Sequence, residues 1–416
     1  MSNDDSGASM GTRNFNADDY AVVLTCGDKD KYRHSECFAS ELAPAFLAQG
    51  LHVLSLDYLR DVRAVSEAVR DKHCVFFVCF NGFGSELMYA AGTPGVLGSV
   101  FEYYGKTLFD FMHDCPVHES MAHQIGSVGE FRRLLCTDYT YAHIARLLGA
   151  KNVQAVPSIT FANTITEGEC PHASRSIDVL LPVGLSRSDE VRERYTYMRN
   201  YRDRVFREIF ESVVDFSLSD LRIDPLVQVL MACQEAGINA DMRDAEVRFL
   251  VTSVGDFVKF ERRDRLVRAL NHLPVTVISD YDVRERYPHT RMNSIGERSF
   301  PDLLRTMSDA KCVVCPVQHH TGFHERALAA FTAGAGVIAG PNEILETHFI
   351  HGRDMLTYQS EDELADMLES VFDGQLELET MARSGREHAL ARFPSAAIVE
   401  TIISGWRRAF SSRRAS

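Results

Sequence analysis

The sequence lacks any apolar run long enough to cross a membrane. Spanning a bilayer takes roughly 18–20 consecutive apolar residues, and no stretch of this chain approaches that length. The first residues also lack the basic, then apolar, then small-residue order of a secretory signal. We therefore expect a cytoplasmic protein.

Basic charge is also scarce. The chain has 44 Lys and Arg residues against 58 Asp and Glu residues, a formal net charge of −14. This balance argues against nucleic-acid binding, for which a basic face is expected. Two local basic patches are exceptions, residues 259–268 and residues 407–414, of which the second is the basic end of a helical segment with an apolar face. Two interpretations stay open for the second patch, namely peripheral contact with anionic lipid and a solvated helix end.

The ten cysteines show no spacing typical of a disulfide framework or a zinc site. Several lie inside apolar runs, as reduced core cysteines do. The single C-x-x-C, Cys312 and Cys315, lies in a predicted strand, which places the two thiols on opposite faces. Three histidines, His319, His320 and His324, lack the carboxylate order of an H-E-x-x-H site. We expect no metal and no cofactor.

The length and composition suffice for two α/β domains. The chain has 416 residues, of which 45% are hydrophobic, and apolar strand patterns alternate with helical ones. We expect a disordered segment over 1–18, a Rossmann-like domain over 19–160, a linker over 161–176 and a second such domain over 177–392. A polar amphipathic stretch predicts a helical insertion over 187–241. The strand candidates are 20–27, 51–58, 73–80, 106–114, 132–138 and 152–158, then 176–184, 245–254, 274–280, 311–317 and 336–340.

The segment TGFHERALAAFTAGAGVIA, residues 321–339, predicts a loop, a helix, a glycine turn and a buried strand in succession. Gly322 precedes the helix, and the unpaired N–H groups of a first helical turn favour an anion such as a diphosphate. The alternative is ordinary helix–strand packing, because many α/β proteins contain such glycines.

Within that segment, RALAAFTAG (326–334) resembles the R-x-x-E-A-x-A-x-G signature of GT-B glycosyltransferases, in particular the CgeB-like group. The resemblance implies two Rossmann-like domains facing across a cleft, with a C-terminal helix (393–416) that crosses back to the first domain. It implies a hexosyltransferase-like enzyme that moves a sugar from a nucleotide-sugar donor to an acceptor hydroxyl without a metal. The family's acidic ribose contact falls at Ala329, so Glu325, one helical turn earlier, is the candidate substitute.

Ligands of open α/β sheets bind beyond the carboxyl ends of the strands. After the strand at 106–114, Asp114 is the first candidate for the catalytic base, and His113 or His118 the second. The alternative is that Asp114 caps the next helix and Pro116 occupies its first turn. The candidate donor-binding residues are Gly184, Arg187, Gly322, Phe323, His324, Glu325, Arg326 and Asn342.

Two other functions stay open at this point. Ala329 favours a degenerate GT-B protein that binds a glycan or a nucleotide without turnover. The fold is also shared by sugar-nucleotide epimerases and hydrolases. The sequence leaves open the donor, the oligomeric state and whether the anomeric configuration is retained or inverted. It also leaves open the class of acceptor, which is a glycan, a lipid-linked group or a protein.

Overall fold

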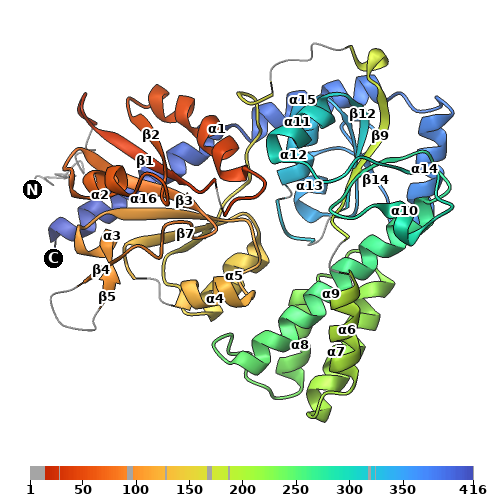
Figure 1. Cartoon of the computed structure of the whole chain (residues 1–416), viewed down its shortest axis with the longest axis horizontal. Coiled ribbons are helices and arrows are strands. Elements are labelled where there is room, and N and C mark those ends of the chain that lie inside the picture. The colour runs from red at the N-terminus through yellow and green to blue at the C-terminus, as the bar shows by residue number, and fades with distance from the viewer. Residues whose placement is uncertain are drawn as a thin grey trace, which may run out of the picture.

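Two parallel six-stranded sheets form the cores of two domains in the computed structural model (Figure 1), which describes residues 15–27, 29–90, 97–126, 129–165, 171–185, 188–316, 320–323 and 325–415. The first sheet has the order β2-β1-β3-β6-β7-β8 and the second β11-β10-β9-β12-β13-β14. The predicted class, two Rossmann-like α/β domains, is confirmed.

The strands lie close to the predicted apolar runs. The first sheet contains β1 (Tyr20–Thr25), β2 (His52–Asp57), β3 (Cys74–Phe80), β6 (Thr107–Met112), β7 (Arg132–Cys136) and β8 (Val153–Ala155), and β4 (Met88–Ala90) pairs with β5 (Leu97–Ser99) apart from it. The second contains β9 (Ile177–Pro182), β10 (Thr276–Ile278), β11 (Asn293–Ser294), β12 (Ala310–Cys315), β13 (Gly336–Ala339) and β14 (Leu356–Thr357). Every residue of β3 is buried, as expected of a parallel strand covered on both faces.

Helices cover both faces of the first sheet. The apolar residues of α1 (His34–Ala48) join one core, and those of α2 (Val62–Arg70) and α3 (Val100–Tyr103) join another on the opposite face. The remaining helices at this end are α4 (Glu119–Gly126) and α5 (Tyr139–Leu147). In the second sheet, Cys312 and Cys315 enter different cores, so the two thiols lie on opposite faces of β12 as predicted.

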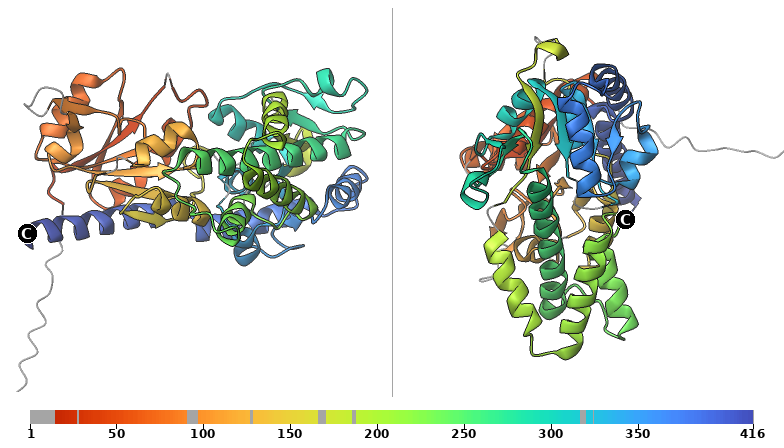
Figure 2. Two further views of the ribbon diagram at one scale, coloured as in Figure 1. Left: turned by 90° about the horizontal axis from the view of Figure 1, so that it is seen from below. Right: turned by 90° about the vertical axis from the view of Figure 1, so that its right-hand side faces the viewer.

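The helical insertion is longer than the sequence suggested. It contains α6 (Ser188–Arg199), α7 (Arg204–Ser219), α8 (Pro225–Glu235) and α9 (Ala245–Leu270), which project together from the second sheet (Figure 2). The strand predicted over 245–254 was wrong, because these residues begin α9. Asp244 caps this helix by accepting from the N–H groups of Glu246 and Val247. Its buried side chains then recur at helical spacing, as Val247, Leu250, Val251, Val254 and Val258.

The insertion also contacts the first domain. The Thr252 hydroxyl of α9 donates to the Val117 carbonyl oxygen at 3.4 Å. Apolar side chains of α9 and of the segment around α4 belong to one buried cluster, which includes Val254, Val258, Val117 and Met121. The long helix α9 therefore connects the two domains along one side of the space between them.

The second domain carries α10 (Val283–Arg286), α11 (Phe300–Ser308), α12 (Glu325–Thr332), α13 (Glu343–His348), α14 (Glu361–Phe372) and α15 (Leu378–Arg392). The last helix, α16 (Ser395–Ala415), runs from this domain along the first one (Figure 2). There Trp406 stacks on Phe15, with ring centroids 5.4 Å apart, and contacts Phe76.

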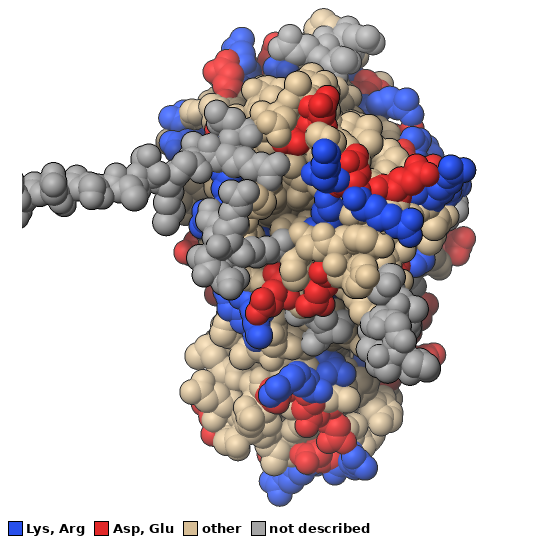
Figure 3. All heavy atoms as spheres, turned by 90° about the vertical axis from the view of Figure 1, so that its left-hand side faces the viewer, with Lys and Arg blue, Asp and Glu red and all other residues tan. Residues whose placement is uncertain are grey.

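Both signs of charge are interspersed on the face of the first domain shown in Figure 3. Across the part of the chain that the structure describes, no helix has the length and apolar character required to span a membrane. Peripheral contact of residues 407–414 with lipid stays a prediction.

Candidate active site

A cleft of about 520 Å³ separates the two domains at the carboxyl ends of their strands. Its first wall comes from the loop between β1 and α1 and from the ends of β3 and β6, and its second from β9, β10 and α12. A second cavity of about 160 Å³ shares part of this lining and extends toward α9 and the end of β7. The residues common to both cavities are His113, Asp114, Arg263, Glu325 and Arg326.

At one end of the cleft, the β1–α1 loop is attached to the second domain. The Phe300 N–H donates to the Tyr32 carbonyl oxygen at 2.6 Å. The Glu297 carboxylate accepts from the Tyr32 hydroxyl and pairs with the Lys31 ammonium, each at 2.5 Å. These contacts hold the loop of the first domain over that end of the cleft.

At the other end, the loop before α12 is attached to the end of β7. The Phe323 N–H donates to the Thr137 carbonyl oxygen at 2.8 Å, and Gly322 forms an antiparallel bridge with Asp138. A Cβ atom on residue 322 would overlap the Asp138 carboxylate, so only glycine fits without rearrangement. The predicted phosphate-binding loop is therefore in direct contact with the first domain.

The candidate base Asp114 lies at the edge of the cleft with an exposed side chain. Its carboxylate oxygen Oδ2 accepts from Nδ2 of Asn81 at 2.9 Å. The next helix, α4, begins only at Glu119, so the alternative in which Asp114 caps that helix does not hold. His118, one of the two second candidates, lines the smaller cavity together with Asp114.

The His113 imidazole is enclosed by aromatic rings. Its centroid lies 4.7 Å from that of Phe38 and 5.1 Å from that of His34, and its side chain is 5% exposed. Nδ1 lies 3.9 Å from a carboxylate oxygen of Glu325, and neither ring nitrogen forms a hydrogen bond within the described residues. Burial lowers the pKa of His113 to about 4, so the ring is neutral at pH 7.

This depressed pKa predicts a loss of stability in mild acid. The unfolded chain binds a proton on His113 below about pH 6.5, whereas the folded protein does so only near pH 4. Stability should therefore fall as the pH drops through this window, by about 2 kcal/mol between pH 7 and pH 5 from this group alone. Urea unfolding at pH 7 and at pH 5 gives the difference in the free energy of unfolding between the two pH values. His113→Phe should reduce this difference by about 2 kcal/mol. An unchanged difference would contradict the assignment.

Three cations converge on the smaller cavity from two helices. Lys259 and Arg263 come from α9, and Arg326 comes from the first turn of α12. Arg263 donates to the Gly184 carbonyl oxygen at 3.2 Å and Arg326 to the Pro182 carbonyl oxygen at 2.9 Å. Among the described residues, none of the three forms an ion pair with a carboxylate.

Burial is the main cause of depressed pKa values in this cluster. It lowers the pKa of Lys259 to about 8, with Arg263 and Arg326 adding to the effect, and it lowers the pKa of Arg263 in the same way. Desolvated like charges repel one another, and a bound anion would relieve that repulsion. Sequence reasoning marked residues 259–268 only as a local basic patch and did not place Lys259 or Arg263 in the donor site, because the helix that carries them was partly read as a strand.

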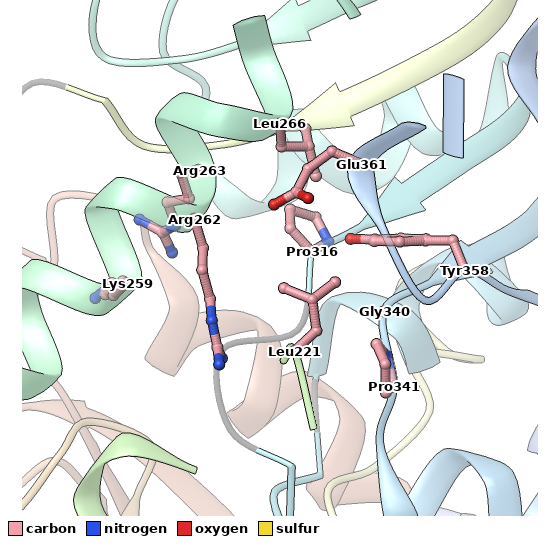
Figure 4. Close-up of a pocket in the computed structure, with 10 residues that line it drawn as sticks. All are labelled: Leu221, Lys259, Arg262, Arg263, Leu266, Pro316, Gly340, Pro341, Tyr358 and Glu361. Atoms are coloured by element: carbon pink, nitrogen blue, oxygen red, sulfur yellow. The ribbon is translucent and has the colours of Figure 1, made fainter. Parts of the chain in front are cut away.

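Arg262, the residue between them, has a different role. Its Nη2 donates to the carbonyl oxygens of Ser217 in the last turn of α7 and of Asp220 and Ile223 in the segment before α8. Figure 4 shows Lys259, Arg262 and Arg263 on α9, at one side of a pocket that Pro316 and Tyr358 also line. The pocket there is about 30 Å³, room for about one water molecule.

The other predicted donor residues are distributed unevenly. Gly184 lines the cleft, and Phe323 lines the smaller cavity, with its ring against Phe393 at 5.5 Å. Asn342 is fully buried, where it caps α13 and donates to the Gly322 carbonyl oxygen at 2.9 Å, so its amide holds the loop before α12. Its direct contact with a donor stays a prediction. Arg187 and His324 lie outside the described residues.

Ala329 is fully buried in the core beneath α12, so the residue at the family's acidic position presents no polar group to the cleft. Glu325, the proposed substitute, lines both cavities and faces His113. The structure thus brings together Asp114, His113, His118, Glu325 and Arg326.

Comparisons with known proteins bear on the fold. Residues 262–404 match the family model described as glycosyl transferase-like. HepE from Anabaena, solved with UDP and glucose, is similar over 93% of this chain and 98% of its own, with 11% identity and a TM-score of 0.51. Sucrose-phosphate synthase from Thermosynechococcus elongatus is similar over 95% of this chain and 100% of its own, with 13% identity and a TM-score of 0.51. A comparison with curated protein sequences gave no match.

These likenesses establish the class. The chain has the GT-B fold, and its second domain contains a glycosyl transferase-like region.

Proposed function

We propose that this protein is a glycosyltransferase that transfers a sugar from a nucleotide-sugar to an acceptor hydroxyl within the interdomain cleft. The observation that carries the proposal is the cluster of Lys259, Arg263 and Arg326, three cations without carboxylate partners in the described structure. A diphosphate supplies the negative charge that such a cluster favours. In support, HepE, which shares the fold, was solved with UDP and glucose.

The donor would lie on the second domain with its diphosphate against Arg263, Arg326 and the first turn of α12. Glu325 would accept hydrogen bonds from hydroxyl groups of the donor, in place of the missing carboxylate at Ala329. His113, neutral and enclosed, would bind a hydroxyl group without adding charge. These positions orient the donor and exclude water, so that catalysis rests on positioning and on fixed charge.

Asp114 would accept the proton of the acceptor hydroxyl as that oxygen bonds to the anomeric carbon. The bond from the sugar to the diphosphate breaks, and the nucleoside diphosphate leaves with its charge stabilised by the three cations. No metal is needed for this step, and we propose that the enzyme works without one. Membership of the CgeB-like group and a cytoplasmic location also remain proposals.

The experiment is the release of free nucleotide from UDP-, GDP-, dTDP- and CMP-sugars, with and without a mixture of glycan acceptors. We expect release from one donor class, faster with a suitable acceptor and unchanged by EDTA. A nucleotide-sugar that raises the melting temperature without any release of free nucleotide would favour the alternative function, a degenerate GT-B protein that binds without turnover. Ala329 is the residue that supports this alternative. Release that no acceptor accelerates would favour a hydrolase or an epimerase.

A further inference from the structure

The turn that follows β3 holds Asp114 by both its backbone and its side chain. Asn81, the first residue after β3, has a left-handed backbone with a φ of 45°. Its Oδ1 accepts from the N–H groups of His113 at 2.8 Å and Asp114 at 3.1 Å. Its Nδ2 donates to Oδ2 of Asp114 at 2.9 Å. One amide side chain therefore fixes the end of β6 and one oxygen of the carboxylate.

A buried ion pair beneath the sheet edge fixes this turn. Asp110 on β6 is fully buried and pairs with Arg132 on β7, whose Nε donates to Oδ2 at 2.9 Å. The other oxygen of Asp110 accepts from the Gly82 N–H at 2.9 Å. Gly82 has a φ of 76°, and a Cβ atom there would overlap the Gln124 side chain. The turn is thus anchored from below by the Asp110 carboxylate.

The remaining oxygen of Asp114 has no partner of this kind. Oδ1 forms no hydrogen bond within the described residues, whereas Oδ2 is held by Asn81. Asn81 itself lines the cleft. A left-handed conformation costs a non-glycine residue roughly 1 kcal/mol or more, and asparagine tolerates it better than most residues. Asn81 therefore holds one oxygen of the Asp114 carboxylate, Oδ2, and leaves the other, Oδ1, available to an acceptor.

We propose that Asn81 is a positioning residue that orients the Asp114 carboxylate toward the acceptor hydroxyl. This inference rests on the proposed function, in which Asp114 is the base. Charged and titratable groups line the two cavities together with Asp114. They are His113, Cys115 and His118 from its own segment, Lys29, Asp30, Lys31, Tyr32 and His34 from the β1–α1 loop and the start of α1, Asp138 and Tyr141 from the end of β7 and from α5, Lys259 and Arg263 from α9, Asp280, Glu297 and Arg298 from the loops after β10 and β11, and Glu325 and Arg326 from α12.

The test compares wild type with Asn81→Asp, using Asn152→Asp as the matched control. Aspartate keeps the oxygen that accepts from His113 and Asp114, removes the N–H donor, and adds a second carboxylate beside Asp114. Asn152 lies in the same domain and donates to the Glu130 carbonyl oxygen, away from the cleft. We expect kcat of Asn81→Asp at pH 7 to fall about 10- to 100-fold with an unchanged KM for the donor. The acid limb of its pH profile should move to higher pH.

A second readout does not require turnover. The Asp114 carboxyl carbon can be titrated by 13C NMR, with its signal assigned from its loss in Asp114→Asn. We expect it to titrate at higher pH in Asn81→Asp than in wild type and Asn152→Asp. An identical titration in all three proteins would overturn the positioning role. A shifted titration in a protein that releases no nucleotide would instead sustain that role and refute the proposed function.

Discussion

Arg263→Ala is expected to weaken donor binding by about 10- to 100-fold, because a hydrogen bond between charged groups contributes about 1.5–3 kcal/mol. Arg263 reaches the cleft from α9, and its only hydrogen bond in the described structure is to the Gly184 carbonyl oxygen. Calorimetric titration of the nucleotide-sugar measures the loss directly. Arg265→Ala is the matched control, since Arg265 lies on the same helix but pairs with Glu261 and the Leu218 carbonyl oxygen.

The same substitution should not destabilise the ligand-free protein. Arg263 is desolvated beside Arg326 and has no carboxylate partner in the described residues, so its removal relieves repulsion. We expect an equal or higher melting temperature without ligand, together with the loss of donor binding. Arg263→Lys should recover only part of the affinity, since lysine cannot offer two parallel N–H groups to a phosphate. Wild-type affinity in Arg263→Ala would refute its role at the diphosphate.

Asp114→Asn is expected to lower kcat by about 100- to 10,000-fold, the usual contribution of general base catalysis. Donor affinity should stay within a factor of two or so, because Asp114 belongs to the opposite wall of the cleft from the diphosphate site. Steady-state kinetics separate the effect on kcat from the effect on donor affinity. The donor used is the one that the nucleotide-release experiment identifies. Asp362→Asn, an exposed position on α14, serves as the control.

Two outcomes would contradict this role. Wild-type turnover in Asp114→Asn would show that another group accepts the proton, with His118 the next candidate in the same cavity. A loss of donor binding without a change in kcat would move Asp114 from catalysis to donor recognition.

Much of the fold could be predicted because parallel strands are short, fully apolar runs between helices. The runs that became β3, β12 and β13 are buried throughout or almost throughout, so composition alone indicates them. The failure at 245–254 has a physical cause. A buried helix and a buried strand both present many apolar residues, and the deciding feature was the spacing Val247, Leu250, Val251 and Val254 after the Asp244 cap.

The candidate site was only partly predictable, because tertiary structure assembles it. Asp114, Glu325 and Arg326 follow from the ends of elements that the sequence indicates, whereas Lys259 and Arg263 come from an inserted helix whose direction no local pattern determines. Gly322 was expected for its place before a helix. What the structure adds is its contact with Asp138 of the other domain, which depends on how the two domains are arranged.

The central claim is tested most directly by calorimetric titration of wild type and of Arg263→Ala. The ligands are UDP, GDP, dTDP and CMP, each free and as a nucleotide-sugar. We expect wild type to bind at least one nucleoside diphosphate and its sugar, with affinity that falls as salt rises and is largely lost in Arg263→Ala. If wild type binds none of these ligands, or if Arg263→Ala binds them equally well, the cleft is not a nucleotide-sugar site.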